Sequence, residues 1–407
     1  MLNVKSVDEV FDIIKDNFSN YETGNEILPL RQALGRQLAF EVTAREDVPG
    51  FNRSSVDGYA VIASDTFGAS EAMPAQLKLA GEVKMGVKPG HALMKGEAMY
   101  IPTGGELPEN ADAVVMIEYS EDYKDGFIYL NKSAAPGNNV VFRGDDIKCG
   151  SRVMAAGKRL RPQDIGVLAA MGICLVEVKK PLKVGIISTG DEVADINEEM
   201  TGSCIRDVNT YSLHSGILEL GAIPICYGIV KDDFNLIEEA AKKALDECDI
   251  VLISGGSSVG AKDETYKVID SLGKPGVLVH GIAVKPGKPT IIGKIGRKAV
   301  VGLPGHPASA FFIFRIFGAR LIEVMAGGSF MTSRVTSGNM AVNYPSNNGR
   351  EEFLPVRIEK KEEKNLVWPV FGKSGLITLL SSAQGYVHIG RGAEGLSAGQ
   401  DVEVILF

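Results

Sequence analysis

The stretch that most constrains the fold is residues 249–309, where three apolar, strand-like runs each lead into a loop rich in Gly, Pro, Lys or Ser. These loops contain SGGSSVGAKD, VKPGKP and GLPGHPAS. Glycine lets a loop backbone approach a ligand closely, and backbone N–H groups at a following helix start attract anions. Because loops after parallel strands gather at one edge of a sheet, the pattern predicts one pocket for a phosphate-bearing ligand.

Strand-like and helix-like segments alternate from residue 182 to residue 327, which predicts a mostly parallel α/β sheet. The expected strands are 184–188, 223–230, 250–254, 277–284, 290–293 and 299–303. The expected helices are 211–220, 236–245, 263–271 and 307–325. The C-terminal remainder has short strands with turn signals, which favours a small β barrel or sandwich.

The rest of the chain divides by composition. Residues 1–45 and 147–177 have helical signals, whereas residues 46–146 alternate short β-rich runs with Gly/Pro turns. We therefore expect a multidomain α/β and β protein with four parts. These are a discontinuous helical and extended N-terminal domain (1–45 plus 147–177), an inserted β-rich domain (46–146), a central α/β domain (178–327) and a C-terminal β domain, taken as a barrel (328–407).

Composition excludes several classes of function. The net charge is −8 with a pI near 5.4, which argues against nucleic-acid or anionic-membrane binding. The five cysteines are scattered without a C-x-x-C pair, which favours a reducing cytoplasm. The histidines are isolated, so a zinc site is not expected. Acidic residues interrupt the N-terminus, so it is not a signal peptide, and the apolar segment 308–318 is too short to span a bilayer.

Acidic side chains follow several expected strands. Glu192 lies in the STGDE loop, Asp232 begins an Asp-Asp pair, and Asp263 ends the glycine-rich loop. Each could simply cap a helix or close a turn. Because all three are expected at the same sheet edge, we favour a magnesium site there.

Two lysines, Lys285 and Lys288, lie in the proline-restricted VKPGKP loop. A solvated turn is the simpler explanation for exposed lysines. A phosphate contact at ~4 Å would contribute about 4 kcal/mol at an effective dielectric of 20. Arg350 is either a surface charge or an oxyanion ligand. Polar loops of residues 46–146 are either turns or functional loops on a rigid scaffold.

Taken together, these motifs resemble the molybdopterin molybdenumtransferase family, which includes the E domain of gephyrin. In order along the chain the matching segments are SVDGYAV, IPTGGELPENADAVVMIE, FRGDDI, STGDE, RDVN, KDD, SGGSSVGAKD, VKPGKP, GLPGHPAS and GREEF. The resemblance covers essentially the whole chain. It implies an elongated protomer that forms a homodimer. It also implies a three-layer α/β domain that binds molybdopterin opposite the inserted domain of the partner subunit.

The implied reaction takes adenylylated molybdopterin and molybdate, releases AMP with the help of Mg²⁺, and gives molybdenum cofactor. The molybdopterin adenylyltransferase and apo-molybdoenzymes are further partners that the resemblance suggests. Two alternatives stay open, namely a molybdopterin adenylyltransferase and a non-catalytic scaffold of the same fold. Molybdate and tungstate are both tetrahedral dianions of similar size, so the residues favour neither.

The resemblance also assigns roles to individual positions. The expected catalytic residues are Asp57, Thr103, Glu192, Asp232, Asp263, Lys285 and Lys288, of which Glu192, Asp232 and Asp263 would hold the metal. Molybdate would contact Lys285, Lys288, Arg350 and Ser374. The pterin nucleotide would contact Arg143, Asp146, Thr189, Gly190, Asp191, Gly255, Gly256, Ser257, Ser258, Gly260, Pro304 and Pro307. His306 and Glu264 depart from the family pattern, in which Asn and Tyr are frequent. We expect His306 to be a turn residue that caps the next helix.

Overall fold

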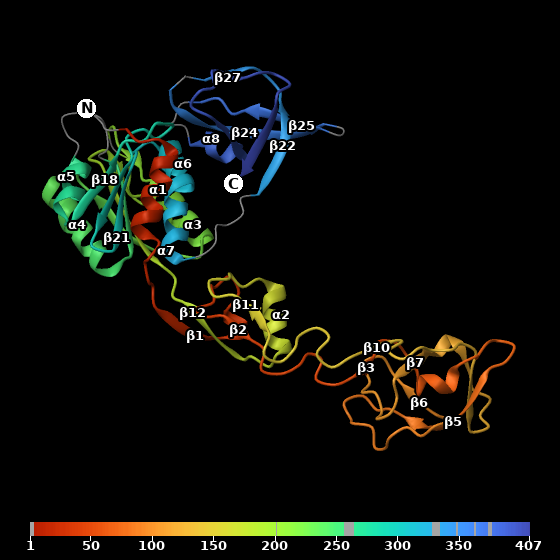
Figure 1. Ribbon diagram of the computed structural model, residues 1–407. Coiled ribbons are helices and arrows are strands. Elements are labelled where there is room, and N and C mark those ends of the chain that lie inside the picture. Colours follow the sequence, from red (N-terminus) through yellow and green to blue (C-terminus); the bar gives the residue numbers. More distant parts are fainter. Residues whose placement is uncertain are drawn as a thin grey trace.

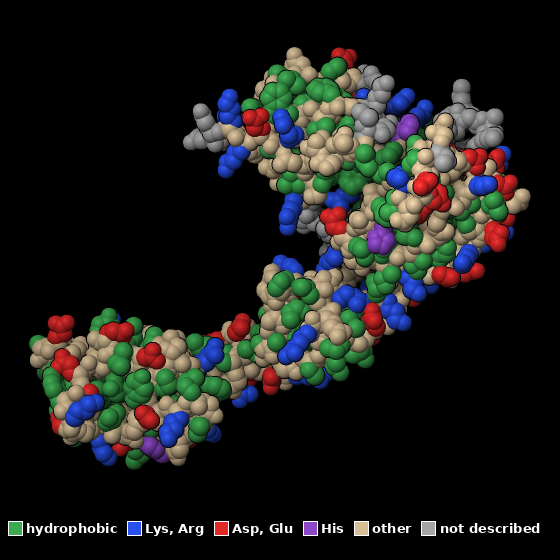
Figure 2. Space-filling view, turned by 180° about the vertical axis from the view of Figure 1, so that it is seen from behind, with side chains coloured by type: hydrophobic (Ala, Val, Ile, Leu, Met, Phe, Trp, Pro, Cys, Tyr) green, Lys and Arg blue, Asp and Glu red, His purple; other side chains and the backbone are tan. Residues whose placement is uncertain are grey.

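The chain forms an elongated, curved molecule (Figure 1). The computed structural model describes residues 4–200, 202–255, 264–327, 334–346, 349–361, 364–372 and 377–407. The inserted domain lies at one end, the N-terminal domain lies in the middle, and the α/β domain and C-terminal domain lie at the other end. Figure 2 shows the same outline from behind, with basic and acidic side chains interspersed on that face.

A six-stranded sheet in the order β16-β13-β17-β21-β20-β18 forms the centre of the α/β domain. Its strands are β13 (Lys183–Thr189), β16 (Ile223–Val230), β17 (Ile250–Ser254), β18 (Pro275–His280), β20 (Ile291–Ile295) and β21 (Lys298–Leu303). The first four strands in this order are parallel, and β20 runs antiparallel to both of its neighbours, β21 and β18. Every residue of β17 is buried, which explains its uninterrupted apolar sequence. The prediction of a mostly parallel α/β sheet is therefore confirmed.

One expected strand is wrong. The apolar run 277–284 does not form a single strand, because Gly281 adopts φ +97° and turns the chain after β18. The run continues as β19 (Val284–Lys285), which pairs with a strand of the C-terminal domain. The VKPGKP loop therefore begins at a seam between two domains.

Helices cover both faces of the sheet, which gives three layers (Figure 1). The helices are α3 (Asn209–Glu219), α4 (Phe234–Glu247), α5 (Glu264–Ser271), α6 (Pro307–Ile313) and α7 (Ala319–Ala326), with a π-helical turn (Phe314–Gly318) between the last two. Residues of α3, α6 and α7 share one apolar cluster, and those of α4 and α5 share another on the opposite face. The four predicted helices are present, although the fourth contains the π turn.

Helix α1 (Val7–Phe18) differs from the expected division of the chain. It has the predicted capping box between Ser6 and Glu9. Its buried residues Val10 and Ile14 join the apolar cluster of the α/β domain, and it packs against α7. The expectation that all of residues 1–45 group with residues 147–177 is therefore wrong for this helix, because its apolar stripe is buried by the α/β core.

The N-terminal domain is built from paired segments that lie far apart in sequence. Strand β1 (Asn25–Pro29) pairs with β12 (Leu175–Lys179), and β2 (Val42–Thr43) pairs with β11 (Arg152–Met154). Helix α2 (Pro162–Ala170) and the 3₁₀ turn η1 (Leu30–Gln32) pack beside them. The segment between β2 and β11 is the inserted domain.

Within the inserted domain, β3 (Arg53–Ser54) forms a short pairing with β10 (Val140–Val141). Its main sheet has the order β7-β4-β6-β5-β9-β8. The strands are β4 (Gly58–Val61), β5 (Ala75–Glu82), β6 (Glu97–Ile101), β7 (Ala113–Met116), β8 (Ser120–Glu121) and β9 (Phe127–Leu130), with 3₁₀ turns η2 (Ala63–Thr66) and η3 (Ile117–Tyr119). Strand β6 lies between β4 and β5 in the sheet.

The C-terminal domain is a closed barrel of five strands. The strands are β22 (Val335–Met340), β24 (Glu351–Lys361), β25 (Lys364–Pro369), β26 (Gly385–Ile389) and β28 (Asp401–Leu406). They pair in the cyclic order β24-β25-β22-β28-β26-β24, which leaves no open edge in the ring. A short pairing of β23 (Tyr344–Pro345) with β27 (Gly395–Leu396) and the helix α8 (Thr378–Ser382) complete it. The barrel, rather than the sandwich, is confirmed.

Candidate functional site

A pocket of about 950 Å³ lies at the carboxyl ends of the parallel strands. Ser188 and Thr189 end β13, Ser254 ends β17 and is followed by Gly255, and Pro304 follows β21. The remaining lining residues are Glu192, Val193, Ile205, Arg206, Asp207, Val208, Asn209, Asp232, Glu264, Pro289, Gly305, His306, Pro307 and Ile377. The structure thus brings Thr189, Glu192, Asp232, Gly255, Pro304 and Pro307 of the predicted site into one pocket.

Gly255 permits the loops after β13 and β17 to touch. It has φ +117°, and a Cβ built on it would lie 2.2 Å from the carbonyl oxygen of Thr189. Only glycine fits this close approach without moving the backbone. The close packing of these two loops beside the pocket therefore requires glycine at position 255.

Three carboxylates gather beside the pocket. The backbone N–H of Asp232 donates to Oδ1 of Asp191 at 3.4 Å, and Glu192 and Asp232 both line the pocket. Partial burial, and then the charges of Asp191 and Glu192, raise the pKa of Asp232 above its ordinary value. Such mutual repulsion is relieved when a cation binds. Among the described residues, however, no three or more His, Cys, Asp or Glu side chains are grouped so that they could hold a metal ion.

Sequence reasoning did not assign a role to Asn209, although the RDVN segment that contains it was noted. Its Nδ2 donates to the Oγ of Ser254 at 2.8 Å and to the carbonyl oxygen of Gly305 at 2.8 Å. Buried Asn209 therefore ties the end of β17 to the PGHP loop. The sequence feature that could have indicated this role is a polar residue at the start of a helix. That helix follows the short strand β15 (Ile205–Arg206), which pairs with β14 (Val193–Ala194).

The lysine loop lies next to this pocket, and only its last residue, Pro289, is part of the lining. The ammonium group of Lys285 lies 2.7 Å from Oε1 of Glu352, a residue of the C-terminal barrel. Arg350 directly precedes the β19–β24 pairing that joins the two domains. Lys285 and Arg350 are therefore near one another along this seam, outside the pocket lining.

The predicted residues of the inserted domain lie elsewhere in the chain. Oδ1 of Asp57 accepts a hydrogen bond from the backbone N–H of Thr103 at 2.8 Å, and Arg143 is paired with Asp47 at 2.6 Å. Asp57, Thr103, Arg143 and Asp146 are all exposed. The domain that carries them is at the opposite end of the molecule from the α/β domain (Figure 1). Within one chain they do not join the pocket.

Several predicted residues cannot be placed. Gly256, Ser257, Ser258, Gly260, Asp263 and Ser374 lie outside the described residues. Of the two departures from the family pattern, His306 occupies the N-cap position of α6 without a side-chain capping bond, and Glu264 begins α5. Both line the pocket. His306 thus has the expected position at the start of α6, where its carbonyl oxygen accepts from the N–H of Ala310 at 2.9 Å, but its side chain makes no capping bond.

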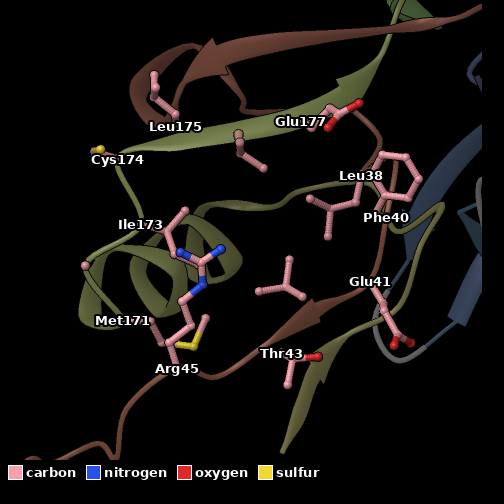
Figure 3. A pocket seen from close by; sticks show the side chains of 13 residues that line it. Leu38, Phe40, Glu41, Thr43, Arg45, Met171, Ile173, Cys174, Leu175 and Glu177 are labelled. Atoms are coloured by element: carbon pink, nitrogen blue, oxygen red, sulfur yellow. The ribbon is translucent and has the colours of Figure 1, made fainter. Parts of the chain in front are cut away.

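A second pocket, of about 450 Å³, lies in the N-terminal domain (Figure 3). Its wall combines apolar side chains such as Phe40 and Ile173 with Glu41, Arg45 and Glu177. None of the predicted site residues lines it. The sequence did not predict this pocket.

Three family models together cover most of the chain. Residues 5–172 match the MoeA N-terminal region (domain I and II), residues 185–323 match a probable molybdopterin binding domain, and residues 337–407 match the MoeA C-terminal region (domain IV). The fold and the pocket thus define a multidomain protein whose α/β sheet is of the molybdopterin-binding type.

Individual relatives agree with these models. The chain is 35% identical to a putative molybdopterin biosynthesis protein of Methanocaldococcus jannaschii, over 100% of this chain and 98% of that protein. It is 30% identical to the molybdopterin molybdenumtransferase of Bacillus subtilis, over 94% of this chain and 89% of that enzyme. A solved structure of the molybdopterin biosynthesis MoeA protein from Pyrococcus horikoshii OT3 superimposes with a TM-score of 0.86 at 33% identity and covers 100% of both chains. The chain belongs to the MoeA family.

The described part of the chain has no helix that is both long enough and apolar enough to cross a membrane.

Proposed function

We propose that this chain inserts molybdate into adenylylated molybdopterin, with magnesium-dependent release of AMP, to give molybdenum cofactor. The observation that carries the proposal is the pocket of about 950 Å³ at the carboxyl ends of the parallel strands. Its volume lies at the upper end of the usual range for small-molecule sites, as a nucleotide-linked pterin requires. The full-length match to relatives named for this pathway points the same way.

The backbone at the strand ends would hold the phosphates. Thr189 and Gly255 bring the loops after β13 and β17 together, which leaves main-chain groups close to any ligand in the pocket, and Gly190 would extend this backbone. Pro304 and Pro307 frame the opposite loop, and Asn209 fixes that loop to β17 through Gly305. In the proposal, Gly256, Ser257, Ser258 and Gly260 would extend the same cradle.

The carboxylates fit magnesium. Mg²⁺ usually takes one or two protein carboxylates together with substrate phosphates, and Glu192 and Asp232 supply two oxygen ligands in the pocket. The raised pKa of Asp232 reflects nearby negative charge that a divalent cation would offset. Asp263 would be a third ligand. When bound, the ion would supply Lewis-acid polarisation of the phosphoric anhydride.

Molybdate would bind beside the pocket, at the seam with the barrel. Lys285, Lys288 and Arg350 are cationic donors suited to a tetrahedral oxyanion, and Ser374 would add a hydroxyl. Since Pro289 lines the pocket, the same loop reaches from the pterin to this seam. The arrangement would place the oxyanion next to the sulfur atoms of the pterin.

The inserted domain would act in a homodimer. Asp57, Thr103, Arg143 and Asp146 are exposed and remain apart from the pocket of their own chain. They can contribute to a site of this kind only if the inserted domain of one protomer faces the α/β domain of its partner. We also place the protein in the cytoplasm, because all five cysteines are free thiols.

The test is a defined mixture of the protein, adenylylated molybdopterin, Mg²⁺ and molybdate, scored for AMP and for metal-loaded pterin. We expect both products only when all components are present. Asp232→Asn should lose most of this activity, whereas Asp246→Asn, at the far end of α4, should keep it. AMP release that ignores molybdate would refute the proposal, and ATP consumption with free molybdopterin would favour the adenylyltransferase. No product in the complete mixture would favour a scaffold, and full activity of Asp232→Asn would contradict the role proposed for that carboxylate.

A further inference from the structure

A buried carboxylate lies at the seam between the α/β domain and the C-terminal barrel. The side chain of Glu352 is only 6% exposed, and both of its oxygens are occupied. Tyr344 donates its hydroxyl proton to Oε1 at 2.7 Å, and Ser346 donates to Oε2 at 2.5 Å. Lys285 supplies the positive charge, with Nζ at 2.7 Å from Oε1. The ion pair and the two hydrogen bonds offset the cost of burying the carboxylate.

The position of Lys285 does not depend on this ion pair. Its backbone belongs to β19, which pairs with β24 so that Val284 is opposite Glu351 and Lys285 is opposite Glu352. The N–H of Glu351 also donates to the carbonyl oxygen of Ala283 at 2.9 Å. Because main-chain contacts already place the lysine, the additional effect of the Glu352 carboxylate at the ammonium group is chiefly electrostatic.

That electrostatic effect is large. The side chain of Lys285 is 44% exposed, so part of its ammonium group is open to a ligand. An oxyanion hydrogen-bonded to Nζ would lie about 3 Å from the positive charge and roughly 5 Å from the carboxylate oxygens. Since Coulomb energy falls as the inverse of distance, the carboxylate would cancel roughly half of the attraction that Lys285 exerts.

We propose that Glu352 acts through Lys285 to weaken oxyanion binding at this seam. The inference rests on the proposed function, in which Lys285, Lys288 and Arg350 hold molybdate. An oxyanion that is to be transferred must leave its cationic ligands, and tighter binding of the ground state lowers KM without raising kcat. Glu352 therefore keeps the substrate site from holding its anion too firmly.

The test compares two neighbouring substitutions in the full-length protein. Glu352→Gln removes the charge that faces Lys285. Glu351→Gln makes the same change in net charge on the next residue, which points to the other face of the strand and pairs with Nε2 of His388 at 2.7 Å. Molybdate binding is measured by equilibrium dialysis at low and high ionic strength, with sulfate as a competing dianion.

We expect Glu352→Gln to bind molybdate about fivefold more tightly at low ionic strength, with a gain that shrinks as salt is added. Sulfate should compete better by a similar factor. In the AMP-release assay, KM for molybdate should fall while kcat does not rise. Glu351→Gln should match the unmodified protein. Unchanged or weaker binding by a folded Glu352→Gln protein would overturn the inference.

Two further variants keep the result interpretable. If Glu352→Gln does not fold, the double substitution K285M/E352M removes both charges together, and its molybdate affinity should stay within about fivefold of the original because the pair presents little net charge. A much larger loss would contradict the inference. Lys288→Ala tests the underlying site. If Lys288→Ala weakens molybdate binding while Glu352→Gln does not change it, only the inference about Glu352 is refuted. If the unmodified protein does not bind molybdate, both this inference and the proposed function are refuted.

Discussion

Gly255→Ala should damage both the stability of the α/β domain and its pocket. The new Cβ would lie 2.2 Å from the carbonyl oxygen and 2.6 Å from Oγ1 of Thr189, and the first of these contacts is with backbone that cannot rotate away. The φ of +117° adds strain of about 1–3 kcal/mol for a residue with a side chain. Overpacking adds about 1–3 kcal/mol more, so we expect a loss of roughly 2–6 kcal/mol.

Gly305→Ala is the matched control in the same pocket. Among the described residues its Cβ would meet only the Cα of Gly255, at an ordinary 3.7 Å, so little change in stability is expected. Urea unfolding followed by circular dichroism gives the free energy of unfolding, and titration with the pterin substrate gives its affinity. If Gly255→Ala differed from Gly305→Ala by less than about 0.5 kcal/mol and bound the pterin normally, the close contact of the two loops would be unimportant.

Two carboxylates should respond to pH with opposite signs. Burial would raise the pKa of Asp164, but hydrogen bonds from Arg161 and Lys158 hold this pKa well below the ordinary range. Asp164→Asn should therefore lower the free energy of unfolding by about 2 kcal/mol at pH 7. This loss of stability should shrink as pH falls below about 4. The pKa of Asp232 is raised, so its ionisation opposes folding, and Asp232→Asn should stabilise the metal-free protein at pH 7 but not below about pH 4. Thermal unfolding of both variants across pH measures whether each substitution lowers or raises stability at pH 7. If the stability of both variants changed with pH in the same way, the opposite pKa shifts of Asp164 and Asp232 would be refuted. Removal of Mg²⁺ with a chelator should abolish AMP release, and added Mg²⁺ should restore it. Activity in chelator would argue against the carboxylate site.

The α/β domain was largely predictable because its signals are local. An apolar run buried on both faces, as in β17, can hardly be anything but a central strand, and Gly327 ends α7 in a left-handed conformation as expected for a helix C-terminus. Helix α1 was placed in the wrong domain for the opposite reason. An amphipathic stripe shows that a helix docks, but the sequence does not say onto which core.

The candidate site was predictable where residues directly follow strands. Thr189, Asp232 and Gly255 end or follow parallel strands, so topology alone brings them together. The role of Asn209 is not predictable in this way, because it depends on the hydroxyl of Ser254 and the carbonyl oxygen of Gly305, which are both distant in sequence. Residues of the inserted domain are a different case, since no rule of local structure indicates which pocket an exposed loop of another domain will face.

The seam between domains shows why the oxyanion residues were the hardest to place. The apolar run 277–284 suggests one strand, yet Gly281 diverts it so that β19 joins a different sheet. That change carries Lys285 away from the pocket lining and sets it against Glu352, a carboxylate more than sixty positions later in the chain. A cation in a loop cannot reveal from sequence whether its charge is free to attract a ligand or is already partly cancelled. At this seam the answer depends on the pairing of two residues from separate domains, and the same pairing determines how strongly an oxyanion can be held.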